Sequence, residues 1–401
     1  MQESSTAPSQ VLQFRQDIHA RLQDRVRRAI EEVLEAELLA ALGSDRHERT
    51  AGRRGYRHGT ITRTVTTREG TRTLAVPRGR VRTATGATEE FRSAVLPRYA
   101  RRTREVDEAV LGCYLAGANS RRIRLALKPL LGEAHLSKSA VSRVVARLKA
   151  LFATWQARDL GPERYGLLFL DGFHLRVRLA GRVVVVPVLA ALGVTESGQK
   201  QLVTLRLAAA EATASWSGLL TDLQRRGLPA PLLVVTDGHA GLKKALEAWP
   251  TVRVQRCATH KGRNLEDACP VHARPELRRD YGRIIYASDG LAARAAYDAF
   301  LKKWTTLCAP VARSLEEAGL DLLTFYAFPK AMWKSLRTTN ALENLNREFR
   351  RRTKTQASFS TEAAAVTVLY GLVALGQIAL RKIDGYQELA AFLATEWKQA
   401  A

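Results

Sequence analysis

The stretch YGLLFLDGFHLRVR, residues 165–178, decides the fold that this sequence predicts. Residues 167–170 are all apolar and lead to Asp171, whereas apolar and polar residues alternate from Phe173 onward. An unbroken apolar run is typical of a strand buried on both faces, and alternation is typical of a half-buried strand. We therefore predict that an acid ends a central strand, near 165–171, and that a hairpin with a strand near 173–179 leads away from it.

A second acid has the same setting in LLVVTDG, residues 232–238, where the apolar run ends at Asp237. Each Asp-Gly pair, taken alone, is also explained by a simple turn after a strand. Two carboxylates at the ends of two buried strands can, however, meet at one edge of a sheet. Together with the segment around Glu343, the two acids favour a functional site over two turns.

Residues 163–256 alternate between strand and helix patterns. Further strands are predicted near 182–192, near 200–208, before Asp237 and around 252–254, with helices over 213–226 and 239–248. Three antiparallel strands, a helix, a parallel strand, a helix and a last strand follow one another in a ribonuclease H-like fold. In that fold the first strand lies beside the strand after the first helix, so Asp171 and Asp237 become neighbours.

The predicted fold class is therefore α/β, with a ribonuclease H-like catalytic core, an all-helical insertion, and preceding segments that suit DNA binding. The predicted segments are an N-terminal helix in 1–44, a basic hairpin-containing segment in 45–104, a helix-turn-helix in 105–155, the first part of the core in 160–260, the helical insertion in 261–336, and the last part of the core in 337–401. An apolar helix over 361–384 belongs to that last part.

The charge of the chain favours a polyanion as its partner. Its 401 residues carry a net charge of +24, which suits nucleic acid better than a membrane surface. No apolar run approaches the roughly 20 residues that span a bilayer, and the first residues lack the pattern of a secretory signal. Four cysteines give no disulfide framework, so we expect a reduced cytoplasmic protein with no membrane partner.

Two N-terminal segments suit DNA contact. Residues 45–105 hold 16 arginines against 6 acidic residues, and residues 60–76 predict a β-hairpin with a basic face. Arginine without compensating acid suits phosphate, although a merely solvated face is the alternative. Residues 105–153 predict three helices with a turn and a basic last helix, as in helix-turn-helix proteins, and plain helix packing is the alternative there.

A third acid, Glu343, is predicted in the first or second turn of a helix that Thr339 or Asn340 caps. Carboxylate oxygens are the ligands that Mg²⁺ and Mn²⁺ prefer, so Asp171, Asp237 and Glu343 suit two such ions. Two ions about 3.5–4 Å apart can activate the attacking oxygen and stabilise the leaving oxygen in phosphodiester displacement. For Glu343 alone, an ordinary surface position is the alternative.

Several motifs, in a fixed order, match one known family. They are RGYRHG (54–59), VPR (76–78), LDG (170–172), TDGHAGL (236–242), QRC to His260 (255–260), RN (263–264) and RTTN to Glu343 (337–343). Over roughly residues 20–385, the chain resembles the Mutator-type transposases of bacterial insertion sequences. The resemblance implies a DDE transposase whose catalytic and metal-binding triad is Asp171, Asp237 and Glu343.

The resemblance also implies how the protein works. Terminal inverted repeats and target DNA would be its partners, subunits would assemble at least as dimers, and the protein would associate with the bacterial nucleoid. Hydrolysis at the element end would free a 3′-OH that then attacks another phosphodiester. The arginines that we expect to contact DNA are Arg54, Arg57, Arg78, Arg337, Arg347, Arg350 and Arg351.

Cys257 and His260 correspond to the Cys-x-x-His signature that this family has near its active site. His260 suits either contact with the scissile phosphate or structural support. Cys269 and His272 repeat the spacing, so the two pairs together offer four zinc ligands, although the resemblance predicts the first pair alone.

Two other functions stay open at this stage. One is a DNA-binding regulator derived from a transposase, against which the intact acids and motifs argue. The other is a ribonuclease H-like nuclease that does not join strands, which explains neither the basic N-terminal region nor the helical insertion. An RNA-binding role lacks the aromatic platform that stacks bases.

Overall fold

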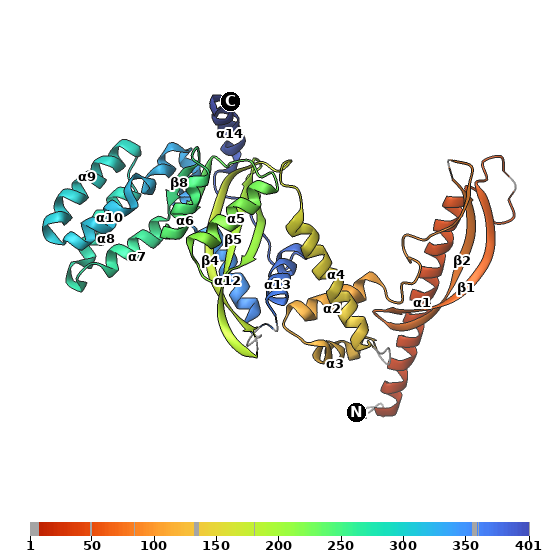
Figure 1. Ribbon diagram of the computed structural model, residues 1–401. Helices are drawn as coiled ribbons and strands as arrows, with labels where there is room; N and C mark the ends of the chain where they lie inside the picture. Colours follow the sequence, from red (N-terminus) through yellow and green to blue (C-terminus); the bar gives the residue numbers. More distant parts are fainter. Residues whose placement is uncertain are drawn as a thin grey trace, which may run out of the picture. The chain divides into compact units, whose positions relative to one another are not determined.

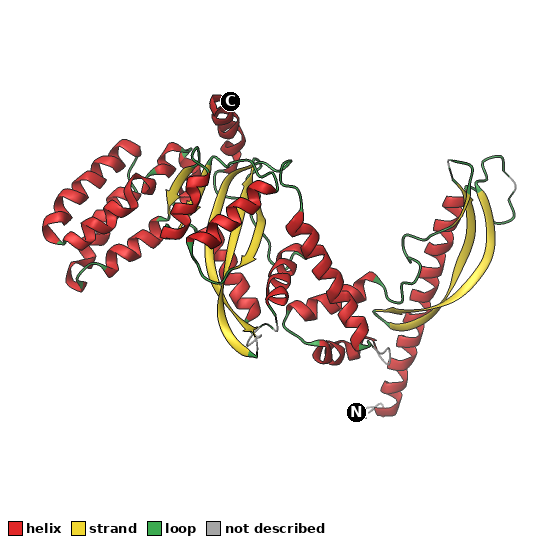
Figure 2. Cartoon of the chain, in the orientation of Figure 1, coloured by secondary structure: helices red, strands yellow, loops and turns green. Residues whose placement is uncertain are grey.

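A computed structural model describes residues 8–48, 50–83, 85–131, 136–179, 181–354, 359 and 361–400. The chain forms two compact units, Met1–Arg147 and Leu148–Ala401 (Figure 1). Each unit has its own β-sheet, drawn in yellow in Figure 2. None of the described helices combines the length and apolar character needed to cross a membrane.

The first unit contains a long helix packed on a β-hairpin. Helix α1 (Pro8–Leu42) contacts β2 (Gly70–Arg82), which pairs with β1 (Gly55–Thr67) and with the short β3 (Thr88–Glu90). Leu34 of α1 is buried with Val65 and Leu74 of the hairpin, so the apolar stripe of the helix covers this sheet. The predicted hairpin and N-terminal helix are confirmed.

Three helices follow the sheet of the first unit, and their order is the predicted one; the last of them crosses the boundary between the units. They are α2 (Arg104–Leu115), α3 (Ser120–Leu131) and α4 (Lys138–Ala157). Val110, Ile123 and Val144, one from each helix, are buried together and hold the three helices as a cluster.

The second unit has a five-stranded sheet in the order β6-β5-β4-β7-β8. Its strands are β4 (Tyr165–Leu179), β5 (Arg182–Thr195), β6 (Lys200–Leu207), β7 (Leu233–Thr236) and β8 (Arg253–Arg256). Strands β4, β5 and β6 pair antiparallel with one another, whereas β7 runs parallel to both β4 and β8. The first strand therefore lies beside the strand that follows the first helix, as the sequence predicted.

One prediction about this sheet is wrong. Residues 165–171 and 173–179 do not form two strands joined by a hairpin, because β4 continues through Asp171 and Gly172 as a single strand. Its antiparallel pairing with β5 extends from Tyr165 to Leu179, with a register shift between Tyr165 and Leu167, and the alternating apolar residues after Asp171 stay buried against the unit. Asp171 instead marks the point at which the pairing of β4 with β7 ends.

Helices cover both faces of this sheet. Helices α5 (Thr213–Arg225) and α6 (Ala240–Ala245) pack on one face, where Trp216 is buried with Leu170. Phe173 points to the opposite face and its ring stacks on that of Phe349, with 5.7 Å between the ring centroids. Phe349 belongs to α12 (Asn340–Thr353), so this stacking fixes the helix that carries Glu343.

The C-terminal helices differ in length from their prediction. Helix α13 (Glu362–Ala374) ends well before residue 384, because Gly376 adopts a left-handed conformation with φ of 71° just beyond it. The chain closes with α14 (Tyr386–Ala400).

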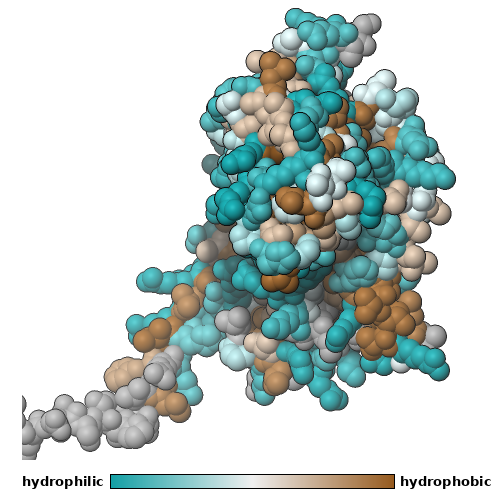
Figure 3. Space-filling model, turned by 90° about the vertical axis from the view of Figure 1, so that its left-hand side faces the viewer, coloured by the Kyte–Doolittle hydropathy of each residue, from teal (hydrophilic) through white to brown (hydrophobic). Residues whose placement is uncertain are grey.

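The segment between β8 and α12 is helical, as predicted for the insertion. It contains α7 (Ala258–Asp267), α8 (Arg274–Ile285), α9 (Gly290–Leu307), α10 (Ala309–Ala318) and α11 (Trp333–Leu336), with short 3₁₀ turns between α10 and α11. Leu265, Trp304 and Leu315 are among the buried side chains that form its own core. Seen from the side of α9, the surface is mostly hydrophilic with scattered apolar groups (Figure 3).

Replacing Phe349 with alanine should lower the free energy of unfolding by roughly 3–5 kcal/mol, because the buried ring would leave a cavity against Phe173. Urea denaturation followed by circular dichroism measures this change. The matched replacement Phe14→Ala, at a ring that is 63% exposed on α1, should change the value by less than about 0.5 kcal/mol. Equal losses in the two variants would contradict the packing.

Candidate active site

Asp171 and Asp237 follow paired positions on two neighbouring parallel strands. Leu170 of β4 is in register with Thr236 of β7, and each acid is the next residue along its chain. Asp237 begins a tight loop, in which its Oδ1 accepts a hydrogen bond of 2.9 Å from the backbone N–H of His239. The register of one strand pair thus brings two carboxylates, 66 positions apart in sequence, to one edge of the sheet.

Gly238 lets this loop form. Its φ is 78°, in the left-handed region that glycine tolerates best, and a Cβ there would lie 1.3 Å from Nη1 of Arg256. The Arg256 guanidinium donates a hydrogen bond to the carbonyl oxygen of Gly238. The buried arginine therefore closes over the loop that positions Asp237.

Asp171 is a buried carboxyl, with only 8% of its surface exposed. Burial and the neighbouring Asp237 carboxylate raise the pKa of Asp171 to about 7; His260 opposes this rise, and Glu343 adds to it. A buried carboxylate beside like charges needs a compensating positive charge in order to ionise at neutral pH.

Glu343 lies in the first turn of α12, as predicted, but Thr339 does not cap the helix through its side chain. The fully buried Thr339 instead donates a hydrogen bond of 2.9 Å from Oγ1 to Oε1 of Glu343. A serine or threonine at this position usually bonds to a backbone N–H. Here the hydroxyl of Thr339 instead holds the side chain of Glu343.

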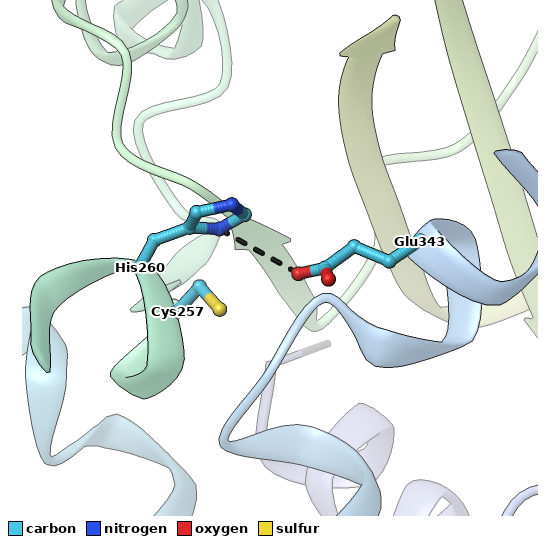
Figure 4. A group of neighbouring side chains, drawn as sticks. All are labelled: Cys257, His260 and Glu343. Atoms are coloured by element: carbon cyan, nitrogen blue, oxygen red, sulfur yellow. Dashed lines mark ion pairs between the residues drawn. The ribbon is translucent and has the colours of Figure 1, made fainter. Parts of the chain in front are cut away.

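Cys257, the residue before α7, and His260, in the first turn of α7, both lie near Glu343 (Figure 4). Nδ1 of His260 lies 3.7 Å from Oε1 of Glu343, and the Cys257 thiol accepts a hydrogen bond of 3.3 Å from the backbone N–H of Thr339. The ligand atoms of Cys257, His260 and Glu343 all lie within 4.8 Å of one another. The structure therefore brings the predicted Cys-x-x-His pair to the third acid.

These contacts favour the cationic form of the His260 ring. Its hydrogen bond with the Cys257 thiol outweighs burial and raises the pKa of His260 to about 8, and Glu343 and Asp237 add to this effect. Burial raises the pKa of the Cys257 thiol, but hydrogen bonds from His260 and Thr339 together hold that pKa below its ordinary value. A positive charge beside Glu343 partly balances the acids.

Cys269 and His272 do not join this group in the described part of the chain. Cys269 is buried in the core of the helical insertion, where its thiol contacts the carbonyl oxygen of Pro270. The hypothesis that both Cys-x-x-His pairs supply one set of zinc ligands receives no geometric support from this arrangement.

Two polar residues near the acids, Asn346 and Glu211, were not predicted from the sequence. Nδ2 of the buried Asn346 donates a hydrogen bond of 2.9 Å to Oδ2 of Asp171. Glu211 lies against Gly172, where an added Cβ would be 2.5 Å from its Oε1. Burial raises the pKa of Glu211, and the nearby Asp237 carboxylate raises it further. Asn346 lies three residues after Glu343 and so on the same helix face, which is the signal that could have found it.

The residues at this edge fit a hard divalent cation. Asp171, Asp237 and Glu343 offer oxygen ligands, and their mutual repulsion is the kind of charge that a bound cation relieves. Among the described residues, Oδ1 of Asn346 is also buried without a hydrogen-bond partner. An uncompensated oxygen and repelling carboxylates together favour a bound cation over a purely structural cluster.

The predicted DNA-contacting arginines differ in their surroundings. Arg57 pairs with Glu35 and Arg78 with Glu90, while Nη2 of Arg54 donates to the carbonyl oxygen of Ala40. These contacts give the three side chains structural roles and leave their DNA contacts as predictions.

The arginines near Glu343 are placed differently. Arg347 and Arg350 are exposed on α12, one and two turns beyond Glu343, and therefore share its face. Arg351 pairs with Glu348, and the Arg337 guanidinium lies over the ring of Tyr286. DNA contact by these four side chains also stays a prediction.

Comparisons with known proteins give one consistent family. Residues 2–377 match the model of a family described as "Transposase, Mutator family". The transposase for insertion sequence element IS905 of Lactococcus lactis is 34% identical over 366 residues, which are 91% of both chains. The transposase for IS406 of Burkholderia multivorans is 35% identical over 357 residues, 88% of this chain and 89% of that one. The transposase for IS1081 of Mycobacterium tuberculosis is 36% identical over 328 residues, 82% of this chain and 76% of that one.

Replacing Asp171 with asparagine should stabilise the metal-free protein at high pH. The pKa of Asp171 is raised on folding from 3.8 to about 7, so ionisation penalises the folded state. This penalty is absent below the unfolded pKa, grows as pH rises between the two values, and is complete above the folded pKa. The variant should therefore exceed the wild type by up to about 4 kcal/mol near pH 8 and match it near pH 4.

Urea unfolding with a chelator at both pH values measures this difference. The exposed replacement Asp17→Asn on α1 serves as the control and should show no such pH dependence. If the stability difference for Asp171→Asn were the same at both pH values, Asp171 would not titrate between them.

Proposed function

The chain belongs to the Mutator family of transposases, and we propose that it cuts and joins DNA strands at the ends of an insertion sequence. The observation that carries this proposal is the meeting of Asp171 and Asp237 where the parallel pairing of β4 with β7 ends, with Glu343 near them. The strand order β6-β5-β4-β7-β8, interrupted by helices before the last acid, supports a ribonuclease H-like core of the DDE kind.

Asp171, Asp237 and Glu343 would hold two divalent cations, Mg²⁺ or Mn²⁺, at this edge. When bound, such ions activate an attacking oxygen and stabilise a leaving oxygen at phosphorus. Asn346 orients Asp171 through its amide N–H, and Thr339 orients Glu343 through its hydroxyl. These two hydrogen bonds hold the carboxylates in place before DNA arrives.

His260 contributes a positive charge beside the acids. Because its pKa is raised to about 8, the imidazole is largely protonated at neutral pH and attracts the phosphate that approaches Glu343. Arg347 and Arg350, on the same helix face as Glu343, extend this positive surface along the DNA backbone. The side chains therefore favour a phosphodiester at the edge where the acids lie.

Two displacements at phosphorus account for the reaction. In the first, water attacks the phosphodiester at the element end, the bond from phosphorus to O3′ breaks, and the leaving oxygen takes a proton to become a 3′-OH. In the second, that 3′-OH loses its proton and attacks a phosphodiester of the target DNA. A bond from its oxygen to the target phosphorus forms, the bond from that phosphorus to the target O3′ breaks, and the leaving O3′ takes up a proton. No covalent bond between protein and DNA is needed.

The first unit would bind the terminal inverted repeats, as its basic hairpin and its helices α2, α3 and α4 suggest. A dimer or larger assembly would hold two element ends together. Leu12, Ile18 and Leu22 of α1 are exposed apolar residues that favour such self-association. The substrate places the protein on the DNA of a bacterial nucleoid.

Single replacements of the acids test this function. A labelled duplex with the inverted repeats that flank the gene is incubated with protein and Mg²⁺, and the strands are separated on a denaturing gel. Asp171→Asn, Asp237→Asn and Glu343→Gln should each slow cleavage and joining by roughly a thousandfold or more. Asp298→Asn, at an exposed acid of α9 that pairs with Arg294 outside the site, should keep full activity.

The products distinguish the competing functions. Binding of the repeats without cleavage by the wild type would favour a DNA-binding regulator. Cleavage that ignores the repeats and yields no joined strands would favour a nuclease. Full cleavage by Asp171→Asn in Mg²⁺ would contradict the assignment of the triad.

Replacing Asn346 with alanine should also slow cleavage, by roughly tenfold to a hundredfold, because Asp171 loses a hydrogen bond to a charged group. Gln399→Ala is the control, since Gln399 is an exposed amide on α14 and its loss should leave the rate unchanged. The rate is measured across the pH range, because loss of the hydrogen bond should move the acidic limb of the profile upward. An unchanged limb with a lower rate would indicate a purely structural role.

A further inference from the structure

A hollow in the first unit is lined by arginines from three separate segments. We call it the arginine cleft and define it by Arg63 of β1, Arg98, Arg101 and Arg102 of the segment before α2, and Arg143 of α4. No acidic side chain is among the described residues that line it. The two segments that the sequence separately suggested for DNA contact, the hairpin and the helical cluster, thus share one concave surface.

The walls of the cleft are held by backbone hydrogen bonds. The segment before α2 runs along the free edge of β1, where the N–H of Thr66 donates to the carbonyl oxygen of Arg101 and the N–H of Thr103 donates to that of Thr66. The Arg63 guanidinium donates to the carbonyl oxygens of Pro97 at 3.1 Å and of Ala100 at 2.6 Å. Arg63 therefore builds the wall rather than presenting a free charge.

The remaining arginines divide into paired and unpaired groups. Arg102 is neutralised by Asp107 at 2.8 Å, and Arg98 meets Glu90 at 3.3 Å in an exposed pair of little energetic weight. Arg101 and Arg143 are exposed, and neither forms an ion pair with a carboxylate in the described part of the chain. Two unopposed guanidinium groups thus border the cleft.

Two further features suit a nucleic acid. The start of α4 lies at the cleft, where Ser137 accepts a hydrogen bond from the N–H of Ala140, and the positive end of a 20-residue helix dipole favours an anion there. Tyr99 is 81% exposed with a left-handed φ of 70°, and the Arg98 guanidinium lies 5.3 Å from the centre of its ring. The fold thus holds a flat ring outward beside a guanidinium group.

We propose that the arginine cleft binds the sugar-phosphate backbone of double-stranded DNA, with Arg101 and Arg143 contacting phosphates. This inference rests on the proposed function and names the surface of the first unit that takes the DNA. Guanidinium groups bind phosphate oxygens in pairs of hydrogen bonds, and such contacts position a duplex without reading its sequence. Arg57 and Arg78, which pair with Glu35 and Glu90, contribute less to binding.

The salt dependence of binding by the full chain tests the proposal. Fluorescence anisotropy measures the affinity for a labelled duplex of the inverted repeat, and for an unrelated duplex, at several salt concentrations. The double variant Arg101→Ala/Arg143→Ala should lower the slope of log K against log salt by roughly two for both duplexes. Affinity at low salt should fall by roughly tenfold per arginine.

Matched variants separate a contact from a change in net charge. Arg21→Ala/Arg25→Ala on α1 removes the same charge from exposed positions outside the cleft and should leave the slope unchanged. Arg101→Lys/Arg143→Lys should restore the slope, because lysine keeps the charge. If the double alanine variant does not give the circular dichroism spectrum of the wild type, Arg143→Ala alone should lower the slope by roughly one.

Each outcome decides between the claims. A cleft variant with the slope of its matched control would overturn the cleft and leave the proposed function standing. A labelled RNA duplex is measured in the same way. If the cleft variants lost affinity for this RNA but kept their affinity for DNA, the proposal that the cleft binds DNA would be overturned. Failure of the wild type to bind either DNA would overturn both the cleft and the proposed function.

Discussion

The parallel pairing of β4 with β7 is the constraint on which the candidate site depends. Four residue pairs, from Leu167 with Leu233 to Leu170 with Thr236, set the register, and the acids follow at once. A shift of one residue would turn one carboxylate to the other face of the sheet. The apolar runs on both strands fix this register, because each is buried against helices on the two faces of the sheet.

Charge is the second constraint. Three carboxylates at one edge repel one another, and the buried Asp171 bears most of the consequence. The chain answers this repulsion locally with hydrogen bonds from Asn346 and Thr339, and with the His260 cation that Cys257 supports. Under the proposed function, the same unfavourable charge would attract divalent cations, which in turn would bind the phosphodiester.

The sequence predicted much of this arrangement, for identifiable reasons. Strand-end acids and apolar runs are local patterns, so the adjacency of Asp171 and Asp237 and the helix of Glu343 could be predicted. The continuity of β4 could not, because an Asp-Gly pair is typical of a turn and only the pairing with β5 keeps the strand extended. The spacing of Asn346 from Glu343 places both on one helix face, but the contact of Asn346 with Asp171 joins residues 175 positions apart, and the local pattern does not reveal that contact.

The arginines show the same limit. Composition indicated a basic surface. It did not indicate which of the arginines form ion pairs with carboxylates of the same chain. Arg57 and Arg78 stand in the recognisable motifs, yet each is paired inside its unit.

The most direct test of the central claim is the anomalous diffraction of crystals grown with Mn²⁺. If two cations bind as proposed, the anomalous difference map should show two peaks between Asp171, Asp237 and Glu343, about 3.5–4 Å apart. Peaks only at Cys257 and His260, with none between Asp171 and Asp237, would contradict it.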